Sequence, residues 1–190
     1  MLFSSKAFLI SAIALATPSL AALNWDQTLM ILKLGQMGTA DTATKNIVNT
    51  SGAGSIMVQN YMQDSINDQA YVVSKGKSGG AINANMPLDA SAITTAFNSW
   101  APYHKDLINS LKAQSALIQD PFFTGFRAGL QLDLASTILV SGQLQAMMPG
   151  SGYATARADI LATANALCKA QKQAITAYGG SPTGGANTCA

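Results

Sequence analysis

The stretch from Gln119 to Pro149 limits the possible folds most, because its apolar residues recur at helical spacing. Asp120 can cap a helix, Pro121 suits the first helical position, and Pro149 followed by glycine ends a helix. Between these ends, steps of three or four, or a double step, join Phe123, Phe126, Leu130, Leu134, Ile138, Leu144 and Met148. The spacing predicts one long amphipathic helix.

This predicted helix has more apolar residues than one buried face requires. Leu132, Leu139, Val140 and Met147 fall on its other faces. A surface helix needs only one apolar stripe. We therefore expect the helix to be central in the fold, or to contact something outside this chain.

A second helix is predicted from Ala90 to about Ile118, where the spacing is the most regular in the chain. Its stripe consists of Ile93, Phe97, Trp100, His104, Leu107 and Leu111. The short Gln119-Asp120 junction predicts that this helix and the next one pack against each other as an antiparallel hairpin.

Three further segments also have helical spacing. A helix capped by Asn24 or Asp26 is weakened at Gly35 and Gly38, which leaves open whether one bent helix or two reach Val48. Others are predicted over Ser55–Ser74, followed by a loop from Lys75 to Gly80, and over Ser151–Tyr178. Because no run alternates long enough to predict a sheet, the expected fold is all-α, a bundle of four or five long antiparallel helices.

The first 21 residues have the pattern of a secretory signal peptide: Lys6, an apolar run from Ala7 to Ala16, and small residues Ser19 and Ala21 before a cleavage site. The run is about half the ~20 residues of a membrane span, which argues against an anchor. We expect a secreted protein, extracellular or associated with a cell wall. Its helical domain would cover residues 22–178 and its Gly-rich tail residues 179–190.

Charge is sparse, and it points to no electrostatic partner. Without Lys6 the chain has ten basic and nine acidic residues, and no charged residue occurs from Leu134 to Ala156. The absence of basic patches argues against nucleic acid. The frequent Ser, Gln, Gly and Pro residues in the uncharged stretch argue against an integral membrane protein. Adsorption to apolar material and a glycosylated wall protein both fit this composition.

Two covalent modifications are predicted. Cys168 and Cys189 are the only cysteines, and an oxidising secretory compartment favours a disulfide between them, although intermolecular pairing or a reactive thiol is also compatible. A loop of about 20 residues closed this way would contribute ~3 kcal/mol. Asn49-Thr50-Ser51 is a glycosylation sequon.

Catalytic and metal motifs are weak. The run from Gly76 to Gly80 matches G-x-S-x-G around Ser78, but a nucleophile elbow needs a strand before it and a helix after it, and a loop is predicted here. His104 is the only histidine, which excludes a multi-histidine metal site. On the core stripe it is either a hydrogen-bonded buried histidine or a polar contact for a ligand headgroup at one end of an apolar cavity. We expect no enzyme, metal or cofactor.

Aromatic residues cluster on the two helices that the Gln119-Asp120 junction joins: Phe97, Trp100, Phe122, Phe123 and Phe126. Such a stripe is either simply packed core or one wall of a cavity or groove for acyl chains. In the second case Phe122, Phe126 and Leu130 would face Phe97 and Trp100, with Leu134 and His104 nearby.

The runs LDASAITTAFNSWAPYHKDLINSLKAQSALI and FRAGLQLDLASTILVSGQLQAMMP, with a last helix ending in AITAY, resemble the hydrophobic surface-binding protein A family, which includes fungal cell-wall galactomannoproteins. The resemblance implies a secreted helical bundle that adsorbs to hydrophobic surfaces, some members holding a fatty acid in a long apolar cavity. The expected partners are thus lipids, fatty acids or apolar surfaces. The alternative is a structural or host-interacting wall protein without a small-molecule ligand.

Overall fold

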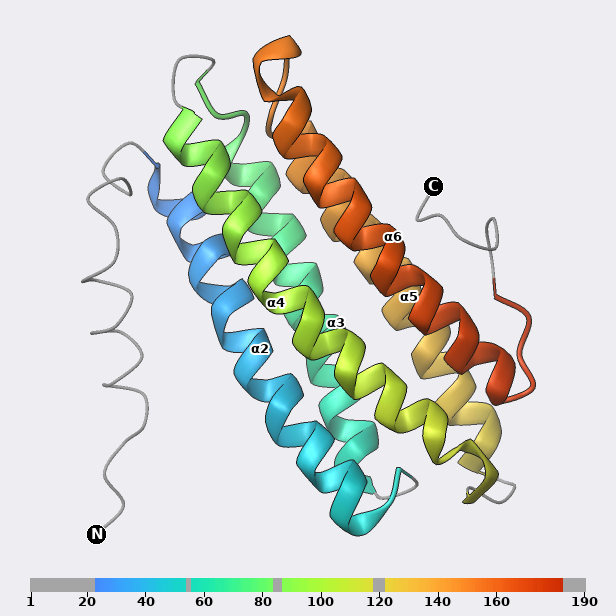
Figure 1. Cartoon of the computed structure of the whole chain (residues 1–190). Helices are drawn as coiled ribbons and strands as arrows, with labels where there is room; N and C mark the ends of the chain where they lie inside the picture. The colour runs from blue at the N-terminus through green and yellow to red at the C-terminus, as the bar shows by residue number, and fades with distance from the viewer. Residues whose placement is uncertain (1–22, 54–55, 84–86, 118–121, 183–190) are drawn as a thin grey trace, which may run out of the picture.

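The computed structural model describes residues 23–53, 56–83, 87–117 and 122–182. Within these ranges it contains five long helices and no strand, which confirms the predicted all-α bundle (Figure 1). The helices are α2 (Trp25–Ser51), α3 (Ile56–Gly79), α4 (Pro87–Ala113), α5 (Phe122–Ala146) and α6 (Ala154–Ala177). Single 3₁₀ turns occur at η2 (Ser115–Leu117) and η3 (Ser151–Tyr153).

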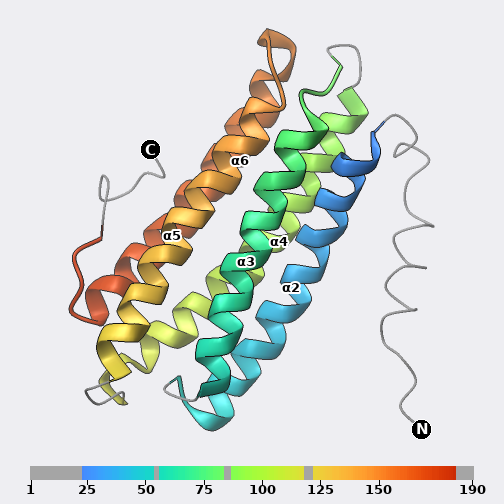
Figure 2. The ribbon, with the colours of Figure 1, turned by 180° about the vertical axis from the view of Figure 1, so that it is seen from behind.

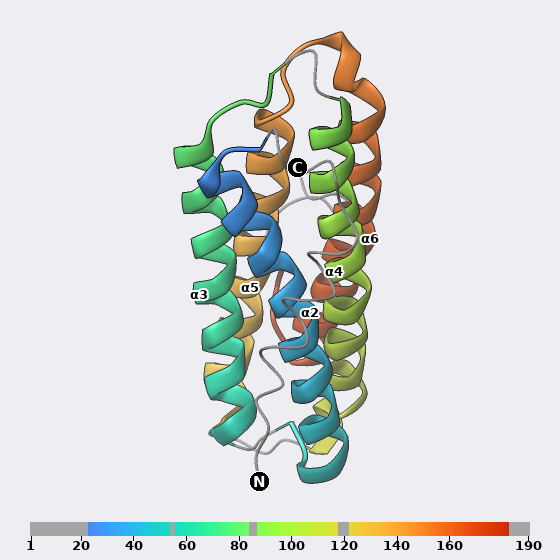
Figure 3. The same ribbon diagram turned by 90° about the vertical axis from the view of Figure 1, so that its left-hand side faces the viewer.

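Successive helices run in opposite directions and form two layers. Figure 1 shows α2, α4 and α6 in front, and Figure 2 shows α3 and α5 on the opposite side. The pairs in close contact are α2 with α3 and α4, α6 with α4 and α5, and α3 with α5. The helices therefore form a closed ring in the order α2, α3, α5, α6, α4, and Figure 3 shows this ring from its side.

The predicted hairpin of α4 and α5 is wrong, because the two helices are antiparallel but lie diagonally across the ring. Helix α4 instead buries Ala101 and Ile108 beside its predicted stripe, so its apolar surface is wide enough for two neighbours, α2 and α6. Apolar spacing indicates which face is buried, but it does not indicate which helix covers that face.

Helix α2 is continuous through both glycines, which settles the alternative left open above. Asn24 caps it in a capping box with Gln27. At Gly38 a Cβ atom would lie 3.1 Å from the Cδ2 atom of Tyr103, so the glycine allows the tyrosine ring to approach the helix.

Helix α3 extends to Gly79, so the predicted loop from Lys75 is wrong as far as that residue. The Gly79 carbonyl accepts hydrogen bonds from Asn24 Nδ2 at 2.7 Å and Gln27 Nε2 at 3.1 Å. A Cβ atom on Gly76 would lie 2.8 Å from Gln143 Cγ. These close contacts with α2 and α5 hold the last turn helical although its composition favours a loop.

Helix α6 ends at Ala177, within one residue of the predicted end at Tyr178. Gly179 has a φ of 70°, the left-handed conformation that glycine adopts without strain. The Gly179 and Gly180 amides donate to the carbonyls of Thr176 and Ile175, both at 2.9 Å, which is a Schellman motif.

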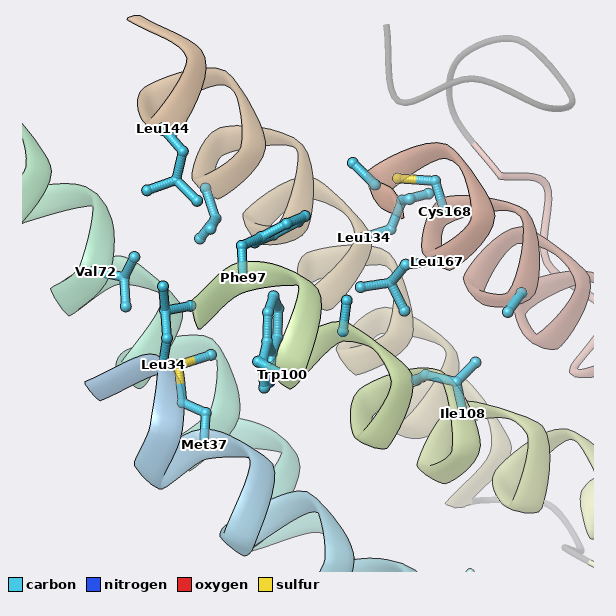
Figure 4. Packing of buried hydrophobic residues seen from close by; sticks show 14 of the residues in the cluster. Leu34, Met37, Val72, Phe97, Trp100, Ile108, Leu134, Leu144, Leu167 and Cys168 are labelled. Carbon is cyan, nitrogen blue, oxygen red and sulfur yellow. The ribbon is translucent and has the colours of Figure 1, made fainter. Parts of the chain in front are cut away.

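The apolar core runs along the inside of the ring. Figure 4 shows Phe97 and Trp100 of α4 among Leu34 and Met37 of α2, Leu134 of α5 and Leu167 of α6. In the described part of the chain, no helix combines the length and apolar character that crossing a membrane requires.

Candidate functional site

A cluster of buried polar side chains lies at the centre of the bundle, and every helix of the ring contributes to it. The core of the cluster is His104 on α4, between Asp41 on α2 and Asp133 on α5. Gln69 on α3 and Gln171 on α6 complete it, and all five side chains are buried. We call these five residues, together with Trp100 and Thr137, the central polar cluster.

Both ring nitrogens of His104 face carboxylates. Nδ1 lies 3.1 Å from Asp41 Oδ1, and Nε2 lies 2.9 Å from Asp133 Oδ2. Only the imidazolium form can donate a hydrogen bond from both nitrogens. Burial alone would lower the pKa of His104, but the charges of Asp133 and Asp41 and their hydrogen bonds outweigh it and raise that pKa well above 6.5. His104 is therefore a buried cation.

The two carboxylates are held by further donors. Trp100 Nε1 donates to Asp41 Oδ2 at 2.8 Å, and the Nε2 amides of Gln69 and Gln171 each donate to Asp133 at 2.7 Å. Burial alone would raise the pKa of Asp133, but the charge and hydrogen bond of His104, with the two amide bonds, lower it. The carboxylate of Asp133 thus stays ionised inside the protein.

Thr137 connects the two amides of the cluster. Its hydroxyl donates to Gln69 Oε1 at 3.2 Å and accepts from Gln171 Nε2 at 2.9 Å. The buried Oε1 atom of Gln171 has no protein hydrogen-bond partner among the described residues.

This arrangement makes His104 structural. Its ring has no nitrogen left for a substrate, and its side chain is 2% exposed. Of the two roles considered above, the structure thus shows the hydrogen-bonded buried histidine. Ser78 lies in the last turn of α3, without the strand–turn–helix geometry of a nucleophile elbow.

The predicted aromatic pairing between α4 and α5 is wrong. His104 of α4 is level with Asp133 of α5. Phe97 precedes His104 by seven residues and Phe126 precedes Asp133 by seven, and because the helices are antiparallel the two rings lie on opposite sides of that contact. At 1.5 Å per residue they are separated by about 20 Å along the bundle. Phe97 instead packs on Trp100, with ring centroids 5.7 Å apart, and Phe126 packs on Tyr178 at 5.0 Å.

The other predicted contact residues divide into two groups. Leu130 and Leu134 are buried in the core, as are Phe97, Trp100 and Phe126. The side chains of Phe122 and Phe123 lie outside the described residues.

The two predicted covalent modifications are not tested. Cys168 is buried but Cys189 lies outside the described residues, so the disulfide stays a prediction. Asn49, in the predicted glycosylation sequon, is exposed near the end of α2.

An open groove of about 590 Å³ lies between α2 and α4, and we call it the α2/α4 groove. Its lining carries no charged side chain. Buried Leu34 and Trp100 form its floor, and Tyr103, which is 53% exposed, stands on its α4 side. The indole of Trp100 therefore separates the groove from Asp41, to which its N–H is bonded.

Helix α5 exposes a second uncharged surface, which we call the outer face of α5. The exposed residues recur at alternating steps of three and four: Gly125, Ala128, Leu132, Ala135, Leu139, Gly142 and Ala146. Leu132 is 55% exposed and Leu139 is 61% exposed. These are two of the apolar residues predicted to lie off the core stripe, whereas the other two, Val140 and Met147, are buried.

The described part of the chain is therefore a five-helix ring with a polar centre and two uncharged surfaces, the α2/α4 groove and the outer face of α5. The chain matches no protein-family model, and no curated protein matches it by sequence. Among solved structures it is similar to AFMP4P in complex with palmitic acid, with a TM-score of 0.70 and 17% sequence identity. The similarity covers 80% of this chain and 99% of that one, which establishes a shared fold.

Proposed function

We propose that this protein is a secreted, non-enzymatic protein that binds fatty acids or other apolar lipids and adsorbs to hydrophobic surfaces. The similarity to AFMP4P carries the proposal, because AFMP4P was solved in complex with palmitic acid and 99% of its chain is covered by the similarity in fold. The uncharged α2/α4 groove, within the 300–1,000 Å³ usual for ligand sites, supports it.

The absence of catalysis is supported by the central polar cluster, in which both nitrogens of the single histidine are bonded to carboxylates. Secretion is supported by the signal-like first 21 residues, which lie outside the described part. The proposal is compatible with release of the protein into the medium and with its retention at a cell wall.

The test is to express the full chain in a eukaryotic secretory host and analyse the purified medium protein. We expect a mature N-terminus near Ala22, a fatty acid in its lipid extract, and uptake of palmitic acid by the delipidated protein in native mass spectrometry. A protein that remains in the cell contradicts secretion.

A protein without bound lipid, palmitate uptake or retention on an apolar resin contradicts lipid binding. That outcome favours a structural or host-interacting cell-wall protein. The central polar cluster is compatible with this second function, because it fills the middle of the bundle with hydrogen-bonded side chains.

A further inference from the structure

We propose that the α2/α4 groove is the site for a single-chain fatty acid, with its alkyl chain over Trp100 and its carboxylate directed toward Lys45. This assignment rests on the function proposed above and adds the location of the site and the orientation of the ligand in it.

The middle of the bundle is closed to an alkyl chain by the central polar cluster. Asp41, His104 and Asp133 span the ring from α2 to α5 through contacts of 3.1 and 2.9 Å. A chain passing along the axis would have to separate these buried charges, and breaking a buried ion pair is strongly destabilising. An acyl chain is therefore expected outside this cluster.

The α2/α4 groove offers such a place directly beside the cluster. Gly35 and Gly38 line its α2 side without side chains, and the Tyr103 ring of α4 lies close against Gly38. The Trp100 indole provides an apolar floor whose N–H is already bonded to Asp41, so covering it with an alkyl chain leaves no donor unpaired. From Leu34 to Asn46 the lined part of α2 spans about 18 Å at 1.5 Å per residue.

An ion pair lies beside one end of the groove, outside its lining. Asn46 lines the groove there, and the preceding Lys45 pairs with Asp106 of α4 through Nζ and Oδ2 at 3.1 Å. This ion pair is exposed, and exposed pairs contribute at most ~1 kcal/mol, so Lys45 can turn to a ligand carboxylate at little cost. The other end, at Leu34 and Gly35, has no charged lining residue and suits the methyl end of the chain.

Fluorescence quenching tests the position of the chain. Trp25 and Trp100 are the only tryptophans, and Trp25→Phe leaves Trp100 as the single emitter. Palmitic acid brominated in mid-chain should quench this emission saturably, because bromine quenches tryptophan on contact. Binding without quenching would overturn the assignment.

A blocking variant and a matched control test the site itself. Ala43 is exposed and lines the groove, whereas Ala70 is exposed on α3. We expect Ala43→Trp to weaken palmitate binding at least tenfold and Ala70→Trp to leave it unchanged, measured by calorimetry on delipidated full-length protein. Circular dichroism checks that both variants fold.

The results separate the two proposals. If the wild type binds no palmitate, the proposed function fails. If the wild type binds palmitate and both tryptophan variants bind equally well, only the groove assignment fails. A native mass spectrum showing a dimer that Ala43→Trp dissociates, with palmitate binding unchanged, would assign the groove to a second copy instead.

Lys45→Met tests the orientation. It should weaken the binding of palmitic acid by about fivefold, the upper range for an exposed ion pair. The binding of hexadecanol, which has no carboxylate, should stay unchanged. Equal loss for both ligands, or no loss for either, would contradict the placement of the carboxylate at Lys45.

Discussion

At the scale of single residues, the position of His104 decides its charge. A solvent-exposed histidine is largely neutral at pH 7, but here both nitrogens face carboxylates that are themselves fixed by Trp100, Gln69 and Gln171. The cluster holds two carboxylates and one imidazolium, and each of its ionic groups depends on the others for charge compensation.

The first prediction concerns pH. Above about pH 6.5 an unfolded histidine loses its proton while native His104 keeps it, so the free energy of unfolding should fall as pH rises toward the native pKa. Below about pH 4 unfolded aspartates gain protons that native Asp133 resists, so the free energy of unfolding should fall as pH falls. The contribution of the cluster is therefore largest between these limits, as urea unfolding across pH would measure.

His104→Gln is the control, since glutamine does not titrate. It should lower the free energy of unfolding by about 3–5 kcal/mol at pH 6, and the difference from wild type should shrink as pH rises. A difference that stays constant up to pH 10 would show that the charge of His104 does not stabilise the fold.

Sequence reasoning at this scale found His104 but not its partners. A histidine on a core stripe requires hydrogen bonds, and its spacing correctly indicated burial. Helical spacing does not single out Asp41 or Gln171 as partners of a histidine, while Asp133 is one of just two charged residues in α5. That isolated charge in an apolar helix was the available signal for a buried ion.

At the scale of helices, some glycines allow a neighbouring helix to pack closely, whereas others lie in open positions. Gly79 abuts the start of α2, where a Cβ atom would lie 2.8 Å from Gln27 Cγ and 3.3 Å from the Gln27 backbone nitrogen. Gly142 on the outer face of α5 has no atom within 4 Å of such a position.

We predict opposite effects for valine at Gly79 and alanine at Gly142. Gly79→Val should destabilise the protein by about 1–3 kcal/mol through overpacking. Gly142→Ala should stabilise it by roughly 0.5–1 kcal/mol, because alanine is the better helix former in an open position. Thermal unfolding of both variants gives the comparison, and a loss of stability in Gly142→Ala would contradict the exposure of this face.

The outer face of α5 supports a prediction about adsorption. Replacing both Leu132 and Leu139 by Gln should reduce retention on an apolar resin, because the two largest exposed apolar side chains of this face are removed. Stability should change by less than about 1 kcal/mol, since neither side chain is in the core. Leu88→Gln, at an exposed leucine in the first turn of α4, is the control that should retain wild-type adsorption.

At the scale of the whole molecule, the sequence predicted four or five long antiparallel helices but not which helices are neighbours. Apolar stripes such as that from Ile93 to Leu111 specify a buried face, and glycine and proline specify the ends. The ring order depends on packing between residues distant in sequence, such as Tyr103 on Gly38 and His104 on Asp133. Neither contact leaves a periodic signal.

The last prediction concerns the tail. If Cys168 and Cys189 pair, the intact protein should be two hydrogens lighter than its reduced form, and Cys189→Ser should lower the free energy of unfolding by about 3 kcal/mol. Denaturant unfolding measures this loss. If the oxidised protein and the variant have equal free energies of unfolding, a disulfide between the tail and α6 does not stabilise the fold.

The ring order also determines how the protein unfolds. Helices α2 and α3 form one antiparallel pair and α5 and α6 form another; α3 contacts α5 directly, and α4 joins α2 to α6. Each pair contains one buried aspartate, Asp41 or Asp133, but neither contains His104, the cation that both carboxylates contact. A fragment with only one pair would bury an uncompensated negative charge, so we expect all five helices to unfold in a single cooperative transition.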